Sequence, residues 1–334
     1  MNLNRIIRSN IIEITGILLL AFTLLFVTLG SSFKVSFDFP PSLLNLNTIF
    51  LSILIEALPF VLIGVLIAGG IQIFVTEAHI QRWLPKNKYL SVTMSCVVGA
   101  LFPACECGIV PIVHRLVAKG VPIHSAMGFM LTGPLINPIV IASTYMAFGN
   151  DFKIAGLRMI LGFLVAVIVA FAISLLFKGN QLRATINRGN IHIHEKKDAL
   201  TKRFWDMLIH SIDEFFDMGK YLIIGAFLSA FVQTYIPAKS LLETGNGPIS
   251  SLLVMIGLAY FLSLCSEADA FIGASFSSIF PTTSILGFLI FGPMIDLKNT
   301  LMMLSVFRLR FVITVLALVF TVVVTTLLLV QSFI

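Results

Sequence analysis

A carboxylate held between two thiols is the most reactive short motif of this sequence, formed by Cys105, Glu106 and Cys107. Thiolates are soft ligands that suit thiophilic ions, whereas a carboxylate suits hard cations. On a regular helix the side chains of a C-x-C pair diverge, so the two sulfurs converge only where the backbone is irregular. The motif therefore indicates either a site for a small solute or ion, or cysteines that simply pack.

A second acidic motif follows later in the chain, where Cys265 precedes Glu267 and Asp269. We expect these acids to occupy the position of Glu106 in a second copy of the motif. An ionised carboxylate at bilayer depth costs at least about 2.5–3.5 kcal/mol, so a cation, a proton, water or substrate must offset the charge. The alternative is a protonated group that caps loose backbone. Glu56 lies near the start of its apolar segment and is interpreted as interfacial.

Two Gly-Pro pairs form a third class of candidate, with Gly133 and Pro134 followed by Asn137, and Gly292 and Pro293 followed by Asp296. Proline lacks a backbone donor and its ring clashes with an earlier carbonyl, so a helix that carries such a pair should kink or break. The freed carbonyls, together with the Asn or Asp side chain, could bind a cation or a polar substrate. Gly-Pro kinks are also ordinary in membrane helices, and this remains the alternative.

The composition of the chain requires a membrane around these motifs. Hydrophobic residues make up 58% of the 334 residues and charged residues only 11%, against about 25% charged residues in typical soluble domains. The net charge of +6 does not indicate nucleic-acid binding, because the basic residues sit in short loops between apolar segments, where membrane topology explains them. The segments are continuously apolar, which excludes a β-barrel with its alternating pattern.

Hydropathy divides the chain into apolar segments, each either long enough to cross a hydrocarbon core of about 30 Å or able to form a hairpin within it. These segments are 11–29, 51–75, 90–118, 124–148, 154–177, 215–236, 249–280, 284–304 and 307–332. The long polar connection between them is rich in lysine and arginine. We therefore divide the chain into an extra N-terminal helix and loop (1–50), a first membrane repeat (51–177), a basic cytoplasmic linker (178–214) and a second repeat (215–334).

The two halves resemble each other in landmarks that recur in the same order. Gly128-Phe129 precedes the first Gly-Pro pair with the same spacing as Gly287-Phe288 precedes the second, and a Cys/Glu motif comes before each. Several matches in register indicate an internal duplication. The repeats are interpreted as inverted, because the charge count below gives them opposite orientations.

Charge counting fixes the topology. The basic N-terminus and the basic linker should both be cytoplasmic, yet five apolar segments separate them, so one segment must enter and leave on the same side. We assign this role to 90–118, which has basic residues on both flanks and Pro103 at its centre. The same pattern makes 249–280 a second re-entrant hairpin and places Lys298 with the cytoplasmic residues. The predicted fold is all-α, with about seven spanning helices plus two broken hairpins, an arrangement found in many secondary transporters.

The run from Phe102 to Pro111, together with the two Gly-Pro elements, resembles the bacterial predicted-permease family that includes the methylarsenite (organoarsenical) efflux permeases. The resemblance covers residues from about 50 to 330. It implies a multi-pass permease of the cytoplasmic membrane and leaves the substrate open. Arsenical members are thought to use membrane cysteines, which here implies Cys105, Cys107 and Cys265 as candidates.

We therefore expect a permease that moves a small solute, for example a thiophilic metal or metalloid species, by alternating access. Its expected partners are the lipid bilayer, the solute or ion, and either a second copy or an accessory membrane subunit; nucleic acid is not among them. No Gly-rich nucleotide loop, haem or quinone signature or Ser/His dyad is present, so we expect no cofactor and no enzyme. Two alternatives stay open: an intramembrane thiol oxidoreductase that uses Cys105 and Cys107, and a membrane subunit of a larger assembly.

The topology is testable by accessibility labelling of single cysteines. Cysteines introduced at Lys86, Lys119 and Asn190 should all react from the cytoplasmic side, because 90–118 returns to the face from which it enters. Reaction of positions 86 and 119 from opposite faces would show that 90–118 crosses the membrane completely, and the inverted repeat would then be wrong.

Overall fold

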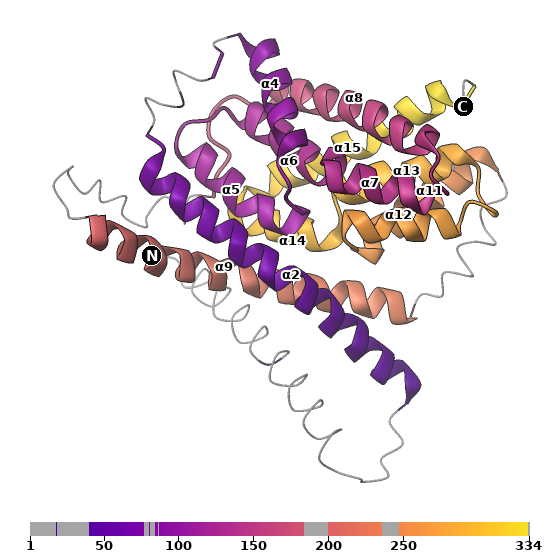
Figure 1. Ribbon diagram of the computed structural model, residues 1–334, viewed down its shortest axis with the longest axis horizontal. Helices are drawn as coiled ribbons and strands as arrows, with labels where there is room; N and C mark the ends of the chain where they lie inside the picture. Colours follow the sequence, from indigo (N-terminus) through magenta and orange to yellow (C-terminus); the bar gives the residue numbers. More distant parts are fainter. Residues whose placement is uncertain are drawn as a thin grey trace.

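The computed structural model describes residue 18 and residues 40–76, 80, 84, 85, 87–183, 200–235 and 247–332. The expected first span at 11–29 lies outside these residues apart from Leu18, as do the N-terminus and much of the basic linker. Elements are named by the labels in Figure 1.

Helices form nearly all of the described chain. The half of the chain expected to form the first repeat contains α2 (Pro41–Phe74), α4 (Lys88–Leu101), α5 (Glu106–Ala118), α6 (Ile123–Ile136), α7 (Pro138–Ala147) and α8 (Phe152–Leu176). The second contains α9 (Leu200–Tyr235), α11 (Pro248–Leu262), α12 (Ser266–Ser275), α13 (Thr282–Met294), α14 (Leu297–Val306) and α15 (Leu309–Val330).

Six stretches of the described chain are long and apolar enough to cross a membrane, namely 41–74, 123–147, 152–176, 207–235, 282–306 and 309–330. They coincide with the predicted spans that follow the first one, so the all-α membrane fold is confirmed. Two ends differ from expectation. α2 begins at Pro41, where proline at the first helical position needs no hydrogen-bond acceptor, and α9 begins at Leu200, inside the range assigned to the linker.

The two predicted hairpins are each a pair of short helices separated by a break. In the first, Pro103 follows the end of α4, and Cys105 precedes α5 in an extended conformation. In the second, Ser263 ends α11 in the left-handed conformation (φ 49°), and the Cys265 sulfur accepts a bond from the Ala268 amide at 3.4 Å. Each break is therefore fixed by local backbone chemistry.

The Gly-Pro pairs do not break their helices where the sequence suggested. Pro134 and Pro293 both remain inside helices, and each break follows slightly later, at Asn137 and at Asp296. These two side chains cap the next helix: Asn137 Oδ1 accepts from the Val140 amide at 2.9 Å, and Asp296 Oδ1 accepts from the Asn299 amide at 2.5 Å. A new cap thus competes with continuation of the old helix, and Pro138 reinforces it by disfavouring helical backbone at Asn137.

The helices pack in matching pairs in the two repeats. α4 packs on α6 as α11 packs on α13, and α6 packs on α8 as α13 packs on α15. Across the repeats α5 contacts α14 and α12 contacts α7, so the second arm of each hairpin meets the half-helix of the other repeat. The α6–α7 and α13–α14 spans form the interior, because 78% and 83% of the residues in their apolar stretches are buried.

The helices that open the two repeats, α2 and α9, pack on each other along one side of the molecule (Figure 1). They run in opposite directions, since Phe50 meets Phe227 with ring centroids 6.0 Å apart, whereas Gly69 near the other end of α2 lies against Ser211. α2 also packs on α5, and α9 on α14. The α2–α9 pair therefore supports the two elements that carry the central charges.

The contact between α2 and α5 depends on glycine. A Cβ atom added to Gly64 would lie 2.2 Å from the Gly108 carbonyl oxygen, whereas one added to Gly70 would meet nothing within 4 Å.

Gly64→Ala should therefore lower the thermal midpoint of the detergent-purified protein by several degrees, as expected of an overpacking cost of about 1–3 kcal/mol. Gly70→Ala is the matched control and should not lower it. Equal midpoints for the two variants would contradict this packing.

Candidate functional site

A buried lysine links the two repeats at the point where the helix breaks meet. The Lys298 ammonium lies 3.2 Å from Glu106 Oε1 and 3.7 Å from Asp296 Oδ2. It also donates a hydrogen bond of 3.1 Å to the Ser263 carbonyl at the break of the second hairpin. Less than a tenth of each of these residues is exposed. We call Glu106, Asp296 and Lys298 the lysine cluster.

Local structure places each member of the lysine cluster. Glu106 is the first residue of α5, where the helix dipole favours a negative charge. Asp296 caps α14, and Lys298 follows in the first turn of the same helix. Gly225 of α9 lets α14 approach closely, since an added Cβ would lie 3.0 Å from the Lys298 Cα. The ion pair between Glu106 and Lys298 therefore joins the first repeat to the second.

A second buried cation, Arg158 of α8, also bridges the repeats. Its guanidinium donates to Thr144 Oγ1 at 2.7 Å and to the Ser266 carbonyl at 3.3 Å, the first residue of α12. Asp269 is buried nearby in α12, with its Oδ2 only 3.0 Å from the position of a Cβ on Gly292. We call Arg158, Thr144, Ser266 and Asp269 the arginine cluster. It joins α8 and α7 to the hairpin of the other repeat.

The two hairpins carry their acids at different positions, contrary to the sequence expectation. Cys105 and Cys265 precede α5 and α12 in the same way, so the counterpart of Glu106 is Ser266 and not Glu267. Asp269 lies against Gly292, and its counterpart Ile109 lies against Gly133. Duplicated backbone therefore holds chemically different side chains.

The remaining predicted residues have separate environments. The side-chain amide of Asn137 bonds only to backbone groups: Oδ1 accepts from the Val140 amide, and Nδ2 donates to the Gly133 carbonyl at 3.2 Å. Cys105 and Cys107 interact with each other through their thiols, next to Glu106. Cys265 interacts with the Glu56 carboxylate, and Glu267 is only partly buried. Within the described residues, no group of three His, Cys, Asp or Glu side chains is arranged to hold a metal ion.

Several buried polar atoms of the two clusters, and one of the neighbouring Asn299, have no hydrogen-bond partner among the described residues. They are Glu106 Oε2, Asp296 Oδ2, Asn299 Oδ1, Arg158 Nε and Ser266 Oγ. Buried polar groups almost always bond to protein, water or a ligand. These donors and acceptors belong to four helices that meet in the centre. A site for a polar solute or for water requires such unpaired groups.

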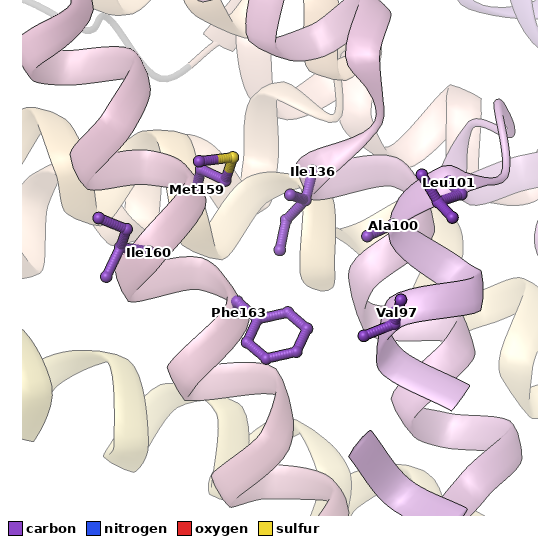
Figure 2. Close-up of a pocket in the computed structure, with 7 residues that line it drawn as sticks. All are labelled: Val97, Ala100, Leu101, Ile136, Met159, Ile160 and Phe163. Carbon is purple, nitrogen blue, oxygen red and sulfur yellow. The ribbon is translucent and has the colours of Figure 1, made fainter. Parts of the chain in front are cut away.

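An apolar pocket lies apart from this polar chemistry. Figure 2 shows the side chains of α4, α6 and α8 that line it, and its volume is about 370 Å³. They are Val97, Ala100, Leu101, Ile136, Met159, Ile160 and Phe163. A pocket with this lining suits a hydrocarbon chain and offers no ligand to a polar solute.

Lys298 and Arg158 are functional candidates that the sequence analysis missed. Lys298 was placed with the cytoplasmic charges and is instead buried, because α14 turns back inside the protein as a half-helix. Arg158 stands alone in the apolar run 154–177. That isolation was a usable signal, since an ionisable residue inside a span is by default a functional candidate.

The cross-repeat ion pair predicts a specific pattern of stability. Lys298→Met should strongly destabilise the protein, by about 3–5 kcal/mol, because it leaves Glu106 buried and unpaired. Adding Glu106→Gln should restore much of this loss, since it removes the orphaned charge. Arg310→Met, at an exposed position, is the control and should have little effect. Thermal unfolding in detergent measures these three variants together with Glu106→Gln alone, and additive losses in the double variant would argue against the pair.

Comparison with known proteins supplies the family. A family described as "Predicted permease" matches residues 42–332. A UPF0718 protein of Bacillus subtilis, YcgR, is 53% identical over 271 residues, which cover 81% of this chain and 92% of the relative. A protein of Streptococcus mutans named "Putative two-component membrane permease complex subunit" is 42% identical over 274 residues, covering 82% and 91%. No solved structure matches the chain.

The family match spans all the described helices and contains both broken hairpins, both Gly-Pro elements and the two central clusters. It confirms the resemblance drawn from the Phe102–Pro111 run and the Gly-Pro elements. The chain belongs to the predicted-permease family.

Proposed function

We propose that this permease carries a small polar or ionic solute across the cytoplasmic membrane by alternating access, with the solute held between the lysine and arginine clusters. The observation that carries the proposal is the ion pair of 3.2 Å between Glu106 and Lys298, whose partners belong to different repeats. A movement of one repeat against the other must break or remake this contact. A central charge pair of this kind can therefore couple solute occupancy to the arrangement of the repeats.

The packing of the repeats supports this mechanism. α2 and α9 open the two repeats and run antiparallel, as inverted repeats require (Figure 1). Broken helices from both repeats end in the same central region, as in many secondary transporters. Contacts that cross between repeats, α5 with α14 and α12 with α7, offer two equivalent interfaces that could open in turn.

The chemistry of the first hairpin favours a thiophilic solute as the substrate class. Cys105 and Cys107 interact at the start of α5, beside a carboxylate that has one free oxygen. Soft sulfur donors next to a carboxylate suit a thiophilic cation or a trivalent metalloid. Cys265 interacts with Glu56 instead, so we place only Cys105 and Cys107 on this solute.

A second component is a further part of the proposal. The name of the Streptococcus mutans relative describes a subunit of a two-component membrane permease complex. This chain shows no ATP-binding motif in its sequence. We infer that it, too, works with a second membrane subunit.

Transport into everted membrane vesicles tests the substrate class, with antimonite as the thiophilic probe. Cys105→Ser and Cys107→Ser should each lower transport more than tenfold, because a hydroxyl keeps the size of the thiol and loses the soft donor. Cys96→Ser is the matched control, since Cys96 packs in a separate cluster with Val92 and Ala170. Normal transport by both hairpin variants would exclude a thiophilic substrate.

Glu106→Gln separates the permease mechanism from its substrate class. It should abolish transport of a thiophilic solute and of any other polar or ionic solute alike, because it removes the charge that links the repeats. Vesicle content of the protein, measured by immunoblot, is the control for insertion. A correctly inserted Glu106→Gln variant that transports normally would show that the acidic hairpin is structural.

A further inference from the structure

A carboxylate lies exposed in the middle of α2. Glu56 was expected at the membrane interface, but α2 extends from Pro41 to Phe74 and places it near the helix centre. It is level with the first hairpin break, because the next turns of α2 pack on α5: a Cβ on Gly108 would lie 2.8 Å from the Phe60 carbonyl oxygen. An exposed carboxylate at this depth is expensive in lipid and needs a partner.

The surrounding face of α2 is apolar and contains a proline that removes one helical hydrogen-bond donor. Ile55, Phe60 and Ile63 are 71%, 45% and 52% exposed. Pro59 has no N–H, so α2 lacks the regular hydrogen bond from residue 59 to the Ile55 carbonyl on the same turn. Lipid cannot satisfy such a group, because it offers no donor. We call this surface, formed by residues 55, 56, 59, 60 and 63, the Glu56 face.

The described part of this chain does not neutralise Glu56. Its interaction there is with the Cys265 thiol, a weak donor that carries no positive charge. The apolar segment 11–29, which lies outside the described residues apart from Leu18, contains threonines and Glu13 but no lysine, arginine or histidine in its sequence. A segment of that composition cannot supply the missing charge.

We propose that the Glu56 face docks a transmembrane helix of a second protein chain that presents a lysine or arginine at mid-membrane. Such a side chain would satisfy the carboxylate through a charge-assisted hydrogen bond. The apolar side chains around Glu56 would pack on the rest of the partner helix. The inference deepens the proposed second component by giving it a docking surface and a required charge.

The consequence of docking reaches the transport site. Glu56 also interacts with Cys265, the residue that precedes α12. A cation bound at Glu56 would therefore lie beside the break of the second hairpin. This position would let the second chain influence the helix that carries Asp269 and accepts the Arg158 contact.

Photo-crosslinking in the native host tests the docking surface. The probe is p-benzoylphenylalanine in place of Ile63, with the crosslinked peptide identified by mass spectrometry. We expect a peptide from a transmembrane segment of another protein, with a lysine or arginine near its centre. Crosslinking should fall at least tenfold when Glu56→Gln is added and should persist with Glu56→Asp. Asp217→Asn, an exposed acid on α9, is the control and should leave the yield unchanged.

Other products would overturn the proposal. Crosslinks to lipid alone, to residues 11–29 of the same chain, or to a second copy of this chain would each assign the face to a different occupant. A yield that is insensitive to Glu56→Gln would remove the charge requirement. Reaction of Glu56→Cys with a membrane-impermeant methanethiosulfonate in whole cells would show a water-filled vestibule instead of a helix. None of these experiments measures transport. Their results therefore test the docking surface independently of the proposed substrate class and of alternating access.

Discussion

The central arrangement depends on one constraint: a charge buried inside a membrane protein must find an opposite charge or a polar group, and here both buried cations find one on the other repeat. Lys298 meets Glu106 at 3.2 Å and Arg158 bonds the Ser266 carbonyl at 3.3 Å. Breaking a buried pair by removing one partner costs about 3–5 kcal/mol. The two repeats are therefore held together by interactions that are strong while closed and costly to open without a replacement.

Helix breaks at the centre follow from the same constraint applied to the backbone. A helix that ends inside the membrane exposes amides and carbonyls that lipid cannot satisfy. The side chains of Asn137, Asp296 and Cys265 each accept a hydrogen bond from a backbone amide at the start of the next helix. The residues that permit the breaks thus also bring polar groups to the centre. A solute that donates hydrogen bonds to Glu106 Oε2 and Asp296 Oδ2 would satisfy the buried oxygens that have no partner among the described residues.

Much of this architecture could be predicted from the sequence, because hydropathy, proline and cap residues act locally. The six described spans and both hairpin breaks follow from such signals. The charged partners could not be predicted in this way. Lys298 looks like a loop cation until tertiary packing turns α14 inward, and Glu56 looks interfacial until α2 proves to begin at Pro41. Burial of these groups depends on contacts between distant segments.

The chemical difference between the repeats makes the two end states of the proposed cycle unequal. If the backbones exchange conformations, the hairpin arm that carries Glu106 takes the place of the arm that carries Ser266 at the corresponding position. The cation that faces each arm differs as well, since Lys298 bonds a carboxylate whereas Arg158 bonds a carbonyl. The two end states therefore differ in free energy when the site is empty. A solute that takes the place of the Glu106–Lys298 pair changes that difference, so its binding is linked to the movement between the two states.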